Sequence, residues 1–293
     1  MDTSLKRVQL TSKADCNDLY LNSSVPVLIE GFVNTWPAFG KWTPEFLASG
    51  CWGKREVPIA TISDGDYVRG EINNMPLRKY LRLVETMEGS TEGKLISNTA
   101  EHTKLTHYLA QVSLAKYFPE LLEDVALPPF FPNETAGSTA LYVGGTLFSQ
   151  LHYHPYGSAT LSVLFGSKRV RLFAPDQGHY LYPNSWFSSL PHISKTHHKD
   201  PDPTKYPKFA QAESIVVTVL PGEMLFIPIY WWHSIENIGV SISTTSFWSR
   251  NWKSRFLPPP GARGPYLLEP ASKLLGTCIK AIRAAGRALP LAK

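Results

Sequence analysis

The spacing of hydrophobic residues divides the chain into three parts. Residues 1–137 mix apolar runs, such as 25–32, with stretches of helical spacing, so an α/β segment is expected there. Residues 138–249 change to short β-type runs separated by Gly, Pro and Asn, which is typical of antiparallel sandwiches and barrels. Residues 250–293 begin with a proline-rich break and continue as a predicted amphipathic helix.

Four segments of the first part are predicted to be helical. Thr43 occupies the position of an N-cap, and Pro44 the first turn, of a short helix. Residues 75–88 carry apolar side chains at helical spacing and predict an amphipathic helix. Two further short helices are expected at 105–118 and 119–125.

Strand-like runs account for most of the second part. They are expected at 139–145, 146–154, 159–166, 168–175, 214–222, 223–228 and 240–248. A polar loop at 183–212 interrupts them, and a loop of this length is usually functional or an insertion. We expect this loop, together with the segment 69–75, to form the walls of any substrate pocket.

Composition and charge indicate a folded body with a basic extension. Hydrophobic residues make up 43% and aromatic residues 12% of the chain, which is enough for a large core and excludes a disordered protein. The net charge of +5 is uneven, because residues 250–293 carry nine basic residues and one acid, whereas residues 1–249 carry 20 and 23. Nucleic-acid binding by the body is therefore not favoured.

Cysteine usage and the N-terminal sequence bear on the compartment. Cys16, Cys51 and Cys278 are too few and too scattered for a disulfide framework. The sequence contains no apolar signal segment at its start and no window long enough to predict a transmembrane segment. We therefore expect a cytoplasmic or nuclear protein.

Three histidines carry the candidate chemistry. His152 and His154 are separated by one residue, which in a strand directs both side chains to the same face. His233 follows another apolar run and could complete a metal site made of three imidazoles. Imidazole suits iron, copper, zinc and nickel, so the ligand type alone does not choose the metal. The competing interpretation is a packed histidine pair without a metal. Four other histidines have no spacing partner and are assigned no metal role: His102, His107, His179 and His192.

The order of these segments resembles the Jumonji C (cupin-8-like) family of Fe(II)- and 2-oxoglutarate-dependent oxygenases. The resemblance rests on PVLIEGFVNTWPAFGKWTPEFL, on HYH followed by GSKRVRLFAP, and on PGEMLFIPIYWWHSIENIGVSISTTSFW. It implies a mostly β fold, with a double-stranded β-helix (jelly-roll or cupin) core at 138–249 and helical N-terminal and C-terminal extensions. It also implies an oxidoreductase, a dioxygenase or hydroxylase, that uses Fe(II), 2-oxoglutarate and O2 on a protein side chain or a small molecule.

The same resemblance implies which residues hold the cosubstrate. Lys168 matches the lysine that pairs with the distal carboxylate of 2-oxoglutarate. Strand alternation supports this role, because it places Lys168 on the apolar face, where a cation needs an anion. Ser149 matches a position that hydrogen-bonds the same carboxylate, and Tyr142 and Ser246 are further cosubstrate candidates.

The metal ligands depart from the family pattern. His152 and His233 match two ligands, but His154 stands where the family has a carboxylate, so the site is one unit more positive. The spacing from His152 to Lys168 is also one residue longer than expected, which predicts a bulge near 156–159. Three functions therefore stay open: a 2-oxoglutarate oxygenase with a three-histidine site, a three-histidine iron or copper dioxygenase without 2-oxoglutarate, or a catalytically inactive binding protein.

The basic tail suggests what the protein assembles with. A helix with an apolar stripe and flanking Lys and Arg can pack on a second subunit, a membrane surface or RNA. Because residues 1–249 are mildly acidic, a homodimer held by the C-terminal helix is the preferred interpretation.

Overall fold

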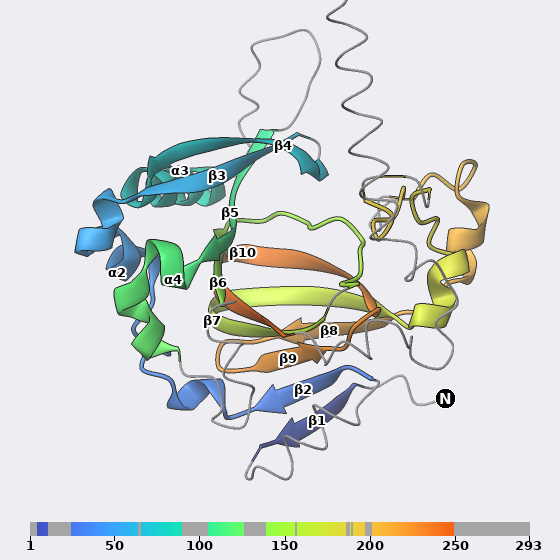
Figure 1. The fold of residues 1–293 in the computed structure, drawn as a ribbon, viewed down its shortest axis with the longest axis horizontal. Coiled ribbons are helices and arrows are strands. Elements are labelled where there is room, and N and C mark those ends of the chain that lie inside the picture. Colours follow the sequence, from blue (N-terminus) through green and yellow to red (C-terminus); the bar gives the residue numbers. More distant parts are fainter. Residues whose placement is uncertain are drawn as a thin grey trace, which may run out of the picture.

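A computed structural model describes residues 5–10, 25–63, 66–89, 105–125, 139–155, 157–185, 188, 190–196 and 201–248. The predicted C-terminal helix, and with it the predicted homodimer, lies outside the described residues. The described part is mostly β, as expected, and its strands form one large connected sheet (Figure 1). Within this part, no helix has both the length and the apolar character needed to cross a membrane.

Ten strands make up this sheet. They are β1 (Lys6–Gln9), β2 (Val27–Glu30), β3 (Glu56–Ser63), β4 (Asp66–Pro76), β5 (Leu105–Ser113), β6 (Ala140–Gly144), β7 (Ser158–Phe173), β8 (Ile215–Val219), β9 (Met224–Ile227) and β10 (Trp232–Trp248). Their order is β1-β2-β9-β7-β10-β6-β5-β3-β4, with β8 paired to β7. Strands β1 and β2 are parallel, and the other pairs are antiparallel. The sheet is therefore mixed, and strands from both predicted parts of the chain share it.

The long β7–β10 ladder forms the centre of the fold. It runs from the pair Phe173–Trp232 to the pair Ser158–Trp248. The runs predicted separately at 159–166 and 168–175 join into the single strand β7 because Gly166 continues the chain with a φ of +68°. A Cβ atom at Gly166 would lie 2.1 Å from the carbonyl oxygen of Val240, so a glycine is required there.

The described residues also form three α-helices and five 3-10 turns. They are α2 (Pro44–Ser49), α3 (Leu77–Gly89), α4 (Leu114–Tyr117) and the 3-10 turns η2 (Val33–Thr35), η3 (Cys51–Lys54), η4 (Pro119–Asp124), η6 (Pro175–His179) and η7 (Pro207–Gln211). The predicted N-cap of α2 is confirmed, since the Thr43 hydroxyl accepts the Phe46 N–H at 3.2 Å. The buried Tyr80 hydroxyl of α3 donates to the Val143 carbonyl at 2.6 Å and accepts the Leu109 N–H at 3.1 Å, which ties α3 to β5 and β6.

The prediction of a helix at 105–118 was wrong over most of its length. Residues 105–113 form β5, which pairs with both β3 and β6, and only 114–117 are helical. The apolar residues Leu109 and Val112 fit a helical period, but pairing on both edges of the strand satisfies the backbone and buries these side chains. Tertiary context here overrides the local pattern.

The expected strand at 146–154 was also wrong as a regular element. This segment makes only isolated bridges, Phe148 with Glu236 and His152 with both Ile193 and His233. Ile242 of β10 pairs with Phe165 and Ser243 pairs with Val163, so one extra residue of β7, Leu164, lies between His152 and Lys168. The recorded register shifts of the β7–β10 ladder lie near Ile238 and Ile242, not at the predicted bulge.

Candidate metal centre

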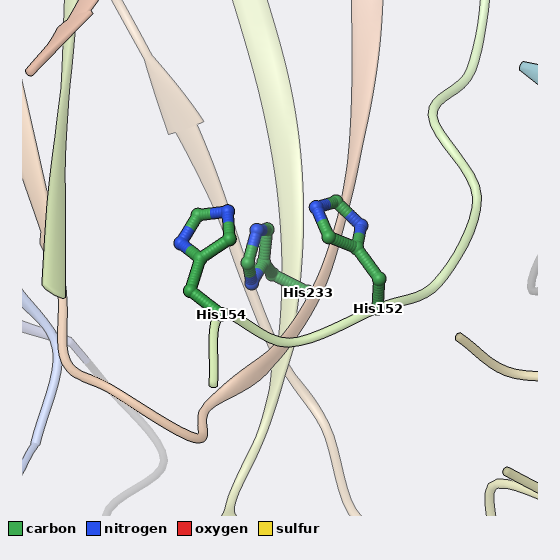
Figure 2. A group of neighbouring side chains, drawn as sticks. All are labelled: His152, His154 and His233. Carbon is green, nitrogen blue, oxygen red and sulfur yellow. The ribbon is translucent and has the colours of Figure 1, made fainter. Parts of the chain in front are cut away.

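The three predicted histidines converge at one end of the β7–β10 ladder. His233 is the second residue of β10, while His152 and His154 come from the irregular segment before β7 (Figure 2). The ring centroids lie 4.3 Å apart for His152 and His233, 4.5 Å for His154 and His233, and 5.3 Å for His152 and His154. One ligand nitrogen from each ring lies within 4.8 Å of the others.

Backbone hydrogen bonds hold this segment against β10. His152 N–H donates to the His233 carbonyl at 3.0 Å, and His233 N–H donates back to the His152 carbonyl at 2.7 Å. Tyr230, in the turn before β10, donates its N–H to the His154 carbonyl at 3.2 Å. Tyr230 has a φ of +72°, a left-handed conformation that is uncommon for a residue with a side chain. The turn thus sets all three histidines relative to one another.

Hydrogen bonds to backbone carbonyls fix the tautomers of two rings. The Nδ1 atom of His152 lies 2.8 Å from the Gln150 carbonyl, and the Nδ1 atom of His233 lies 2.9 Å from the Trp231 carbonyl. A carbonyl only accepts, so each Nδ1 carries the proton and each Nε2 keeps its lone pair. The buried Nδ1 of His154 has no hydrogen-bond partner among the described residues.

Burial keeps the three imidazoles neutral. It lowers the pKa of His152 to about 4, because the charged ring would lose its hydration. Burial, followed by the proximity of His233, holds the pKa of His154 well below its ordinary value. The pKa of His233 is held low by burial and then by His152. Neutral imidazole is the form that ligates metals, so the lone pairs are available at neutral pH.

The donor set fits a transition-metal ion. Three neutral nitrogens within 4.8 Å of one another can reach ligand distances of about 2 Å from one ion with small side-chain adjustments. The carbonyl partners of His152 and His233 are the outer hydrogen bonds that usually orient ligating histidines. No carboxylate of the described residues joins this group, so these three ligands would leave a divalent ion with its full charge.

A cavity of about 340 Å³ adjoins the histidines. Its walls are mainly apolar and aromatic side chains from several strands. The lining residues are Ala60, Ile72, Tyr108, Gln111, Tyr142, Phe148, Ser149, Gln150, His152, His154, Ala159, Leu161, Lys168, Leu190, His192, Ile193, Ile227, His233, Ile235, Thr245 and Phe247. Among these described lining residues there is no Asp or Glu.

Lys168 is the one Lys or Arg among the described residues that line the cavity. Its side chain is 1% exposed, and its Nζ donates to Asn237 Oδ1 at 2.6 Å. The alternation expected for its strand is confirmed, because Val170 and Leu172 are buried with it while Arg169 is exposed. Burial lowers the pKa of Lys168 to about 7. Burying an ammonium group beside a neutral partner costs the free protein stability. Binding of an anion at Lys168 would offset this cost.

The other three cosubstrate candidates differ in position. Ser149 and Tyr142 line the cavity, and the Ser149 hydroxyl accepts the Ile235 N–H at 2.8 Å. The Ser246 hydroxyl instead lies 2.9 Å from the Thr139 hydroxyl, whereas its neighbours Thr245 and Phe247 contribute to the lining. Strand alternation therefore directs Ser246 away from the cavity.

The two segments predicted as pocket walls do contribute to the lining. Ile72 comes from β4, and Leu190, His192 and Ile193 come from the 183–212 loop. His192 has no spacing partner and was not predicted to reach the site, yet an isolated bridge between His152 and Ile193 brings its segment to the cavity. No sequence signal identifies this contact, which depends on the path of the loop.

Gln111 and Asn237 were missed for different reasons. Gln111 has a φ of +55° where the β5–β6 register shifts, and the resulting bulge turns its side chain to the cavity. A bulge inside a segment interpreted as helical could not be predicted. Asn237 follows His233 by four residues in β10 and shares its face, but the strand was expected to begin only at 240, so alternation from His233 was not applied.

Comparison with known proteins agrees with the fold. The cupin-like domain family matches residues 13–254. The chain is 30% identical over 257 residues to lysine-specific demethylase 8 of Xenopus tropicalis, covering 85% of this chain and 53% of that protein. It is 27% identical over 235 residues to tRNA wybutosine-synthesizing protein 5 of Homo sapiens, covering 76% of this chain and 70% of that protein.

A further relative has the same character. The chain is 30% identical over 232 residues to Jumonji C domain-containing protein 5 of Drosophila melanogaster, covering 76% of this chain and 54% of that protein. The chain thus spans about half the length of several curated relatives that it matches. Since the matched region includes the jelly-roll strands, the three-histidine cluster and the buried lysine, this chain belongs to the cupin-like, Jumonji C domain family.

Proposed function

We propose that this protein is a non-haem Fe(II)- and 2-oxoglutarate-dependent oxygenase with a three-histidine metal site. The observation that carries the proposal is Lys168, a buried cation in the same cavity as the histidine cluster. A metal site alone has no use for such a lysine, and the described lining offers it no carboxylate. An anionic cosubstrate that reaches from the metal to Lys168 accounts for both features.

Different residues would hold the metal and the cosubstrate. His152, His154 and His233 would hold the iron, and Lys168 would bind the distal carboxylate of 2-oxoglutarate. Bound iron would supply the activation of O2, with the overall conversion of 2-oxoglutarate, O2 and a substrate C–H group into succinate, CO2 and the hydroxylated product. The apolar walls exclude water from the reacting groups, while Tyr142 and Ser149 offer hydroxyl groups beside the cosubstrate.

The lining also bears on the substrate. One relative is named as a demethylase specific for lysine, and another as a tRNA wybutosine-synthesizing protein. A lysine side chain that entered this cavity would meet Lys168 and the metal without a described acidic residue to offset the repulsion. We therefore propose an uncharged group on a protein side chain or a small molecule as the target, with Gln111 as a neutral polar contact at the wall.

The proposal is tested by product analysis with the metal-loaded protein. Protein reconstituted anaerobically with Fe(II) is exposed to O2 and 2-oxoglutarate, with peptide and metabolite pools as candidate substrates, and succinate is quantified. We expect succinate only when both Fe(II) and 2-oxoglutarate are present, and none from His152→Ala. O2 consumption without 2-oxoglutarate would instead identify a three-histidine dioxygenase, and no metal uptake would identify a binding protein.

A further inference from the structure

Lys168 has one charged end and a partner that carries no charge. Its Nζ lies 2.6 Å from Asn237 Oδ1, and both side chains are 1% exposed. The two residues face each other directly in the β7–β10 register. An ammonium group has three N–H donors, so one is held by Asn237 and two can be offered to a ligand.

The orientation of the Asn237 amide is determined by its other contacts. Its Nδ2 donates to the Gly145 carbonyl at 3.1 Å, and its backbone N–H donates to the Leu147 carbonyl at 2.9 Å. Rotating the amide by half a turn would place its oxygen against the Gly145 carbonyl and its NH2 against the Lys168 ammonium. Both contacts would be repulsive, so Oδ1 must face Lys168.

The described groups around Lys168 leave its charge uncompensated. On β10 the neighbouring Glu236 pairs with Arg169 at 2.9 Å, on the opposite face of the ladder. On β8 the residue opposite Lys168 is Val219. From β5 the ring of Tyr108 lies 6.0 Å from Nζ. The other titratable groups that line the cavity are Tyr142 and the histidines His152, His154, His192 and His233.

We infer that Asn237 is a positioning residue, which holds the Lys168 ammonium by a neutral acceptor and so leaves its charge for the distal carboxylate of the cosubstrate. This inference rests on the proposed function. An aspartate at this position would form an ion pair with Lys168 and compete with the cosubstrate, whereas a residue without an acceptor would leave the long lysine side chain free to turn away. The Asn237 amide anchors the lysine side chain and leaves its charge unneutralised.

The arrangement couples cosubstrate binding to proton uptake. Burial lowers the pKa of Lys168 to about 7, and a bound carboxylate favours the charged form. Affinity for 2-oxoglutarate should therefore be highest below pH 7 and should fall as the pH rises from 7 to 9. With an aspartate at 237, Lys168 would stay charged throughout that range, so the affinity should be lower but nearly independent of pH.

The test is a titration of 2-oxoglutarate into protein saturated with Mn(II) under anaerobic conditions, in which no turnover occurs. Dissociation constants are measured by calorimetry between pH 7 and 9 for the native protein, Asn237→Asp and Asn237→Ala. We expect at least a tenfold weaker binding for both variants at pH 7, with a flat profile for Asn237→Asp only. Asn237→Ala should keep the native slope, because it removes the anchor and adds no charge.

Matched controls separate this effect from damage to the fold. Glu236→Gln replaces a carboxylate by an amide at the position next to Asn237. It should change the dissociation constant of 2-oxoglutarate by no more than about twofold, because the Glu236 side chain is directed away from the cavity. Mn(II) affinity and urea unfolding are measured for each variant. If native protein binds 2-oxoglutarate and both Asn237 variants bind it with the native affinity and slope, the inference is overturned. If metal-loaded native protein binds no 2-oxoglutarate, the proposed function itself fails.

Discussion

His152 and His233 exchange both of their backbone hydrogen bonds, at N–O distances of 3.0 and 2.7 Å, as directly opposed residues of an antiparallel bridge. This pairing brings their rings to a centroid distance of 4.3 Å without the help of a continuous strand. Two of the three imidazoles are therefore placed by the backbone, and His154 joins them through the turn at Tyr230. The metal site is thus built into the end of the β7–β10 ladder.

Replacing His154 by Asp or Asn separates the effect of charge from that of ligand loss. The aspartate would supply an anionic ligand, so we expect His154→Asp to bind Fe(II) about tenfold more tightly than the native protein. His154→Asn, similar in size but uncharged, should bind less tightly than the native protein. Anaerobic competition with a chromophoric chelator measures both. If the native chain takes up no Fe(II) and only His154→Asp does, His154 marks a lost metal site.

Lys168→Met should weaken cosubstrate binding while leaving the fold intact. Methionine fills the same space without a charge, which removes the cost of burying an ammonium but leaves Asn237 Oδ1 without its donor. These effects oppose each other, so we expect the free energy of unfolding to change by only about 1 kcal/mol. Affinity for 2-oxoglutarate should fall by at least about tenfold. Arg169→Met, on the exposed face of β7, serves as the control and should bind 2-oxoglutarate normally.

The metal-free protein should lose stability on acidification. The pKa of His152 is lowered by burial to about 4, whereas in the unfolded chain it is about 6.5. Between these values only the unfolded state takes up a proton, so stability is retained above pH 6.5 and is lost as the pH falls toward 4. The slope from this histidine is at most about 1.4 kcal/mol per pH unit.

Urea unfolding of the metal-free protein at pH 7, 6 and 5 measures this slope. His152→Asn should show a smaller loss than the native protein, because one buried imidazole has been removed. Equal slopes for the native protein and His152→Asn would contradict the expected coupling between burial and protonation.

Gln111 tests whether the bulge in β5 stores backbone strain. Its φ of +55° is accessible to glycine without cost but is unfavourable for a residue with a Cβ atom. We expect Gln111→Gly to be more stable than Gln111→Ala by about 1 kcal/mol. The two midpoints of urea unfolding give this difference. At an ordinary strand position the alanine variant would be more stable than the glycine variant. If Gln111→Ala proves the more stable, residue 111 does not keep the left-handed conformation.

Much of the fold followed from local patterns, and the exceptions have physical reasons. The strand at Val27–Glu30, the capped helix at Pro44–Ser49 and the apolar runs of β8 and β9 were predictable from periodicity and capping residues. Strand β5 was not, because its apolar residues also fit a helical period and only its two neighbours decide the outcome. β1 and β4 were not predicted as strands, since their residues show no clear alternation.

The site was predictable where residues share one strand or one short segment. The HxH spacing and the inward face of Lys168 each follow from the sequence, and the structure brings these residues to one cavity. His192 and Gln111 depend on a loop path and a bulge, which local spacing does not encode. Ser246 was predicted to lie beside the cosubstrate, but its hydroxyl contacts Thr139 instead.

A crystal structure of protein loaded anaerobically with Fe(II) and 2-oxoglutarate, with anomalous data at the iron edge, would locate the metal and the cosubstrate together. We predict one anomalous peak at ligand distance, about 2 Å, from nitrogens of His152, His154 and His233. We also predict 2-oxoglutarate density that joins this peak to the Lys168 ammonium. A peak elsewhere, a His154 ring turned away from the metal, or a metal centre with no 2-oxoglutarate reaching Lys168 would contradict the account.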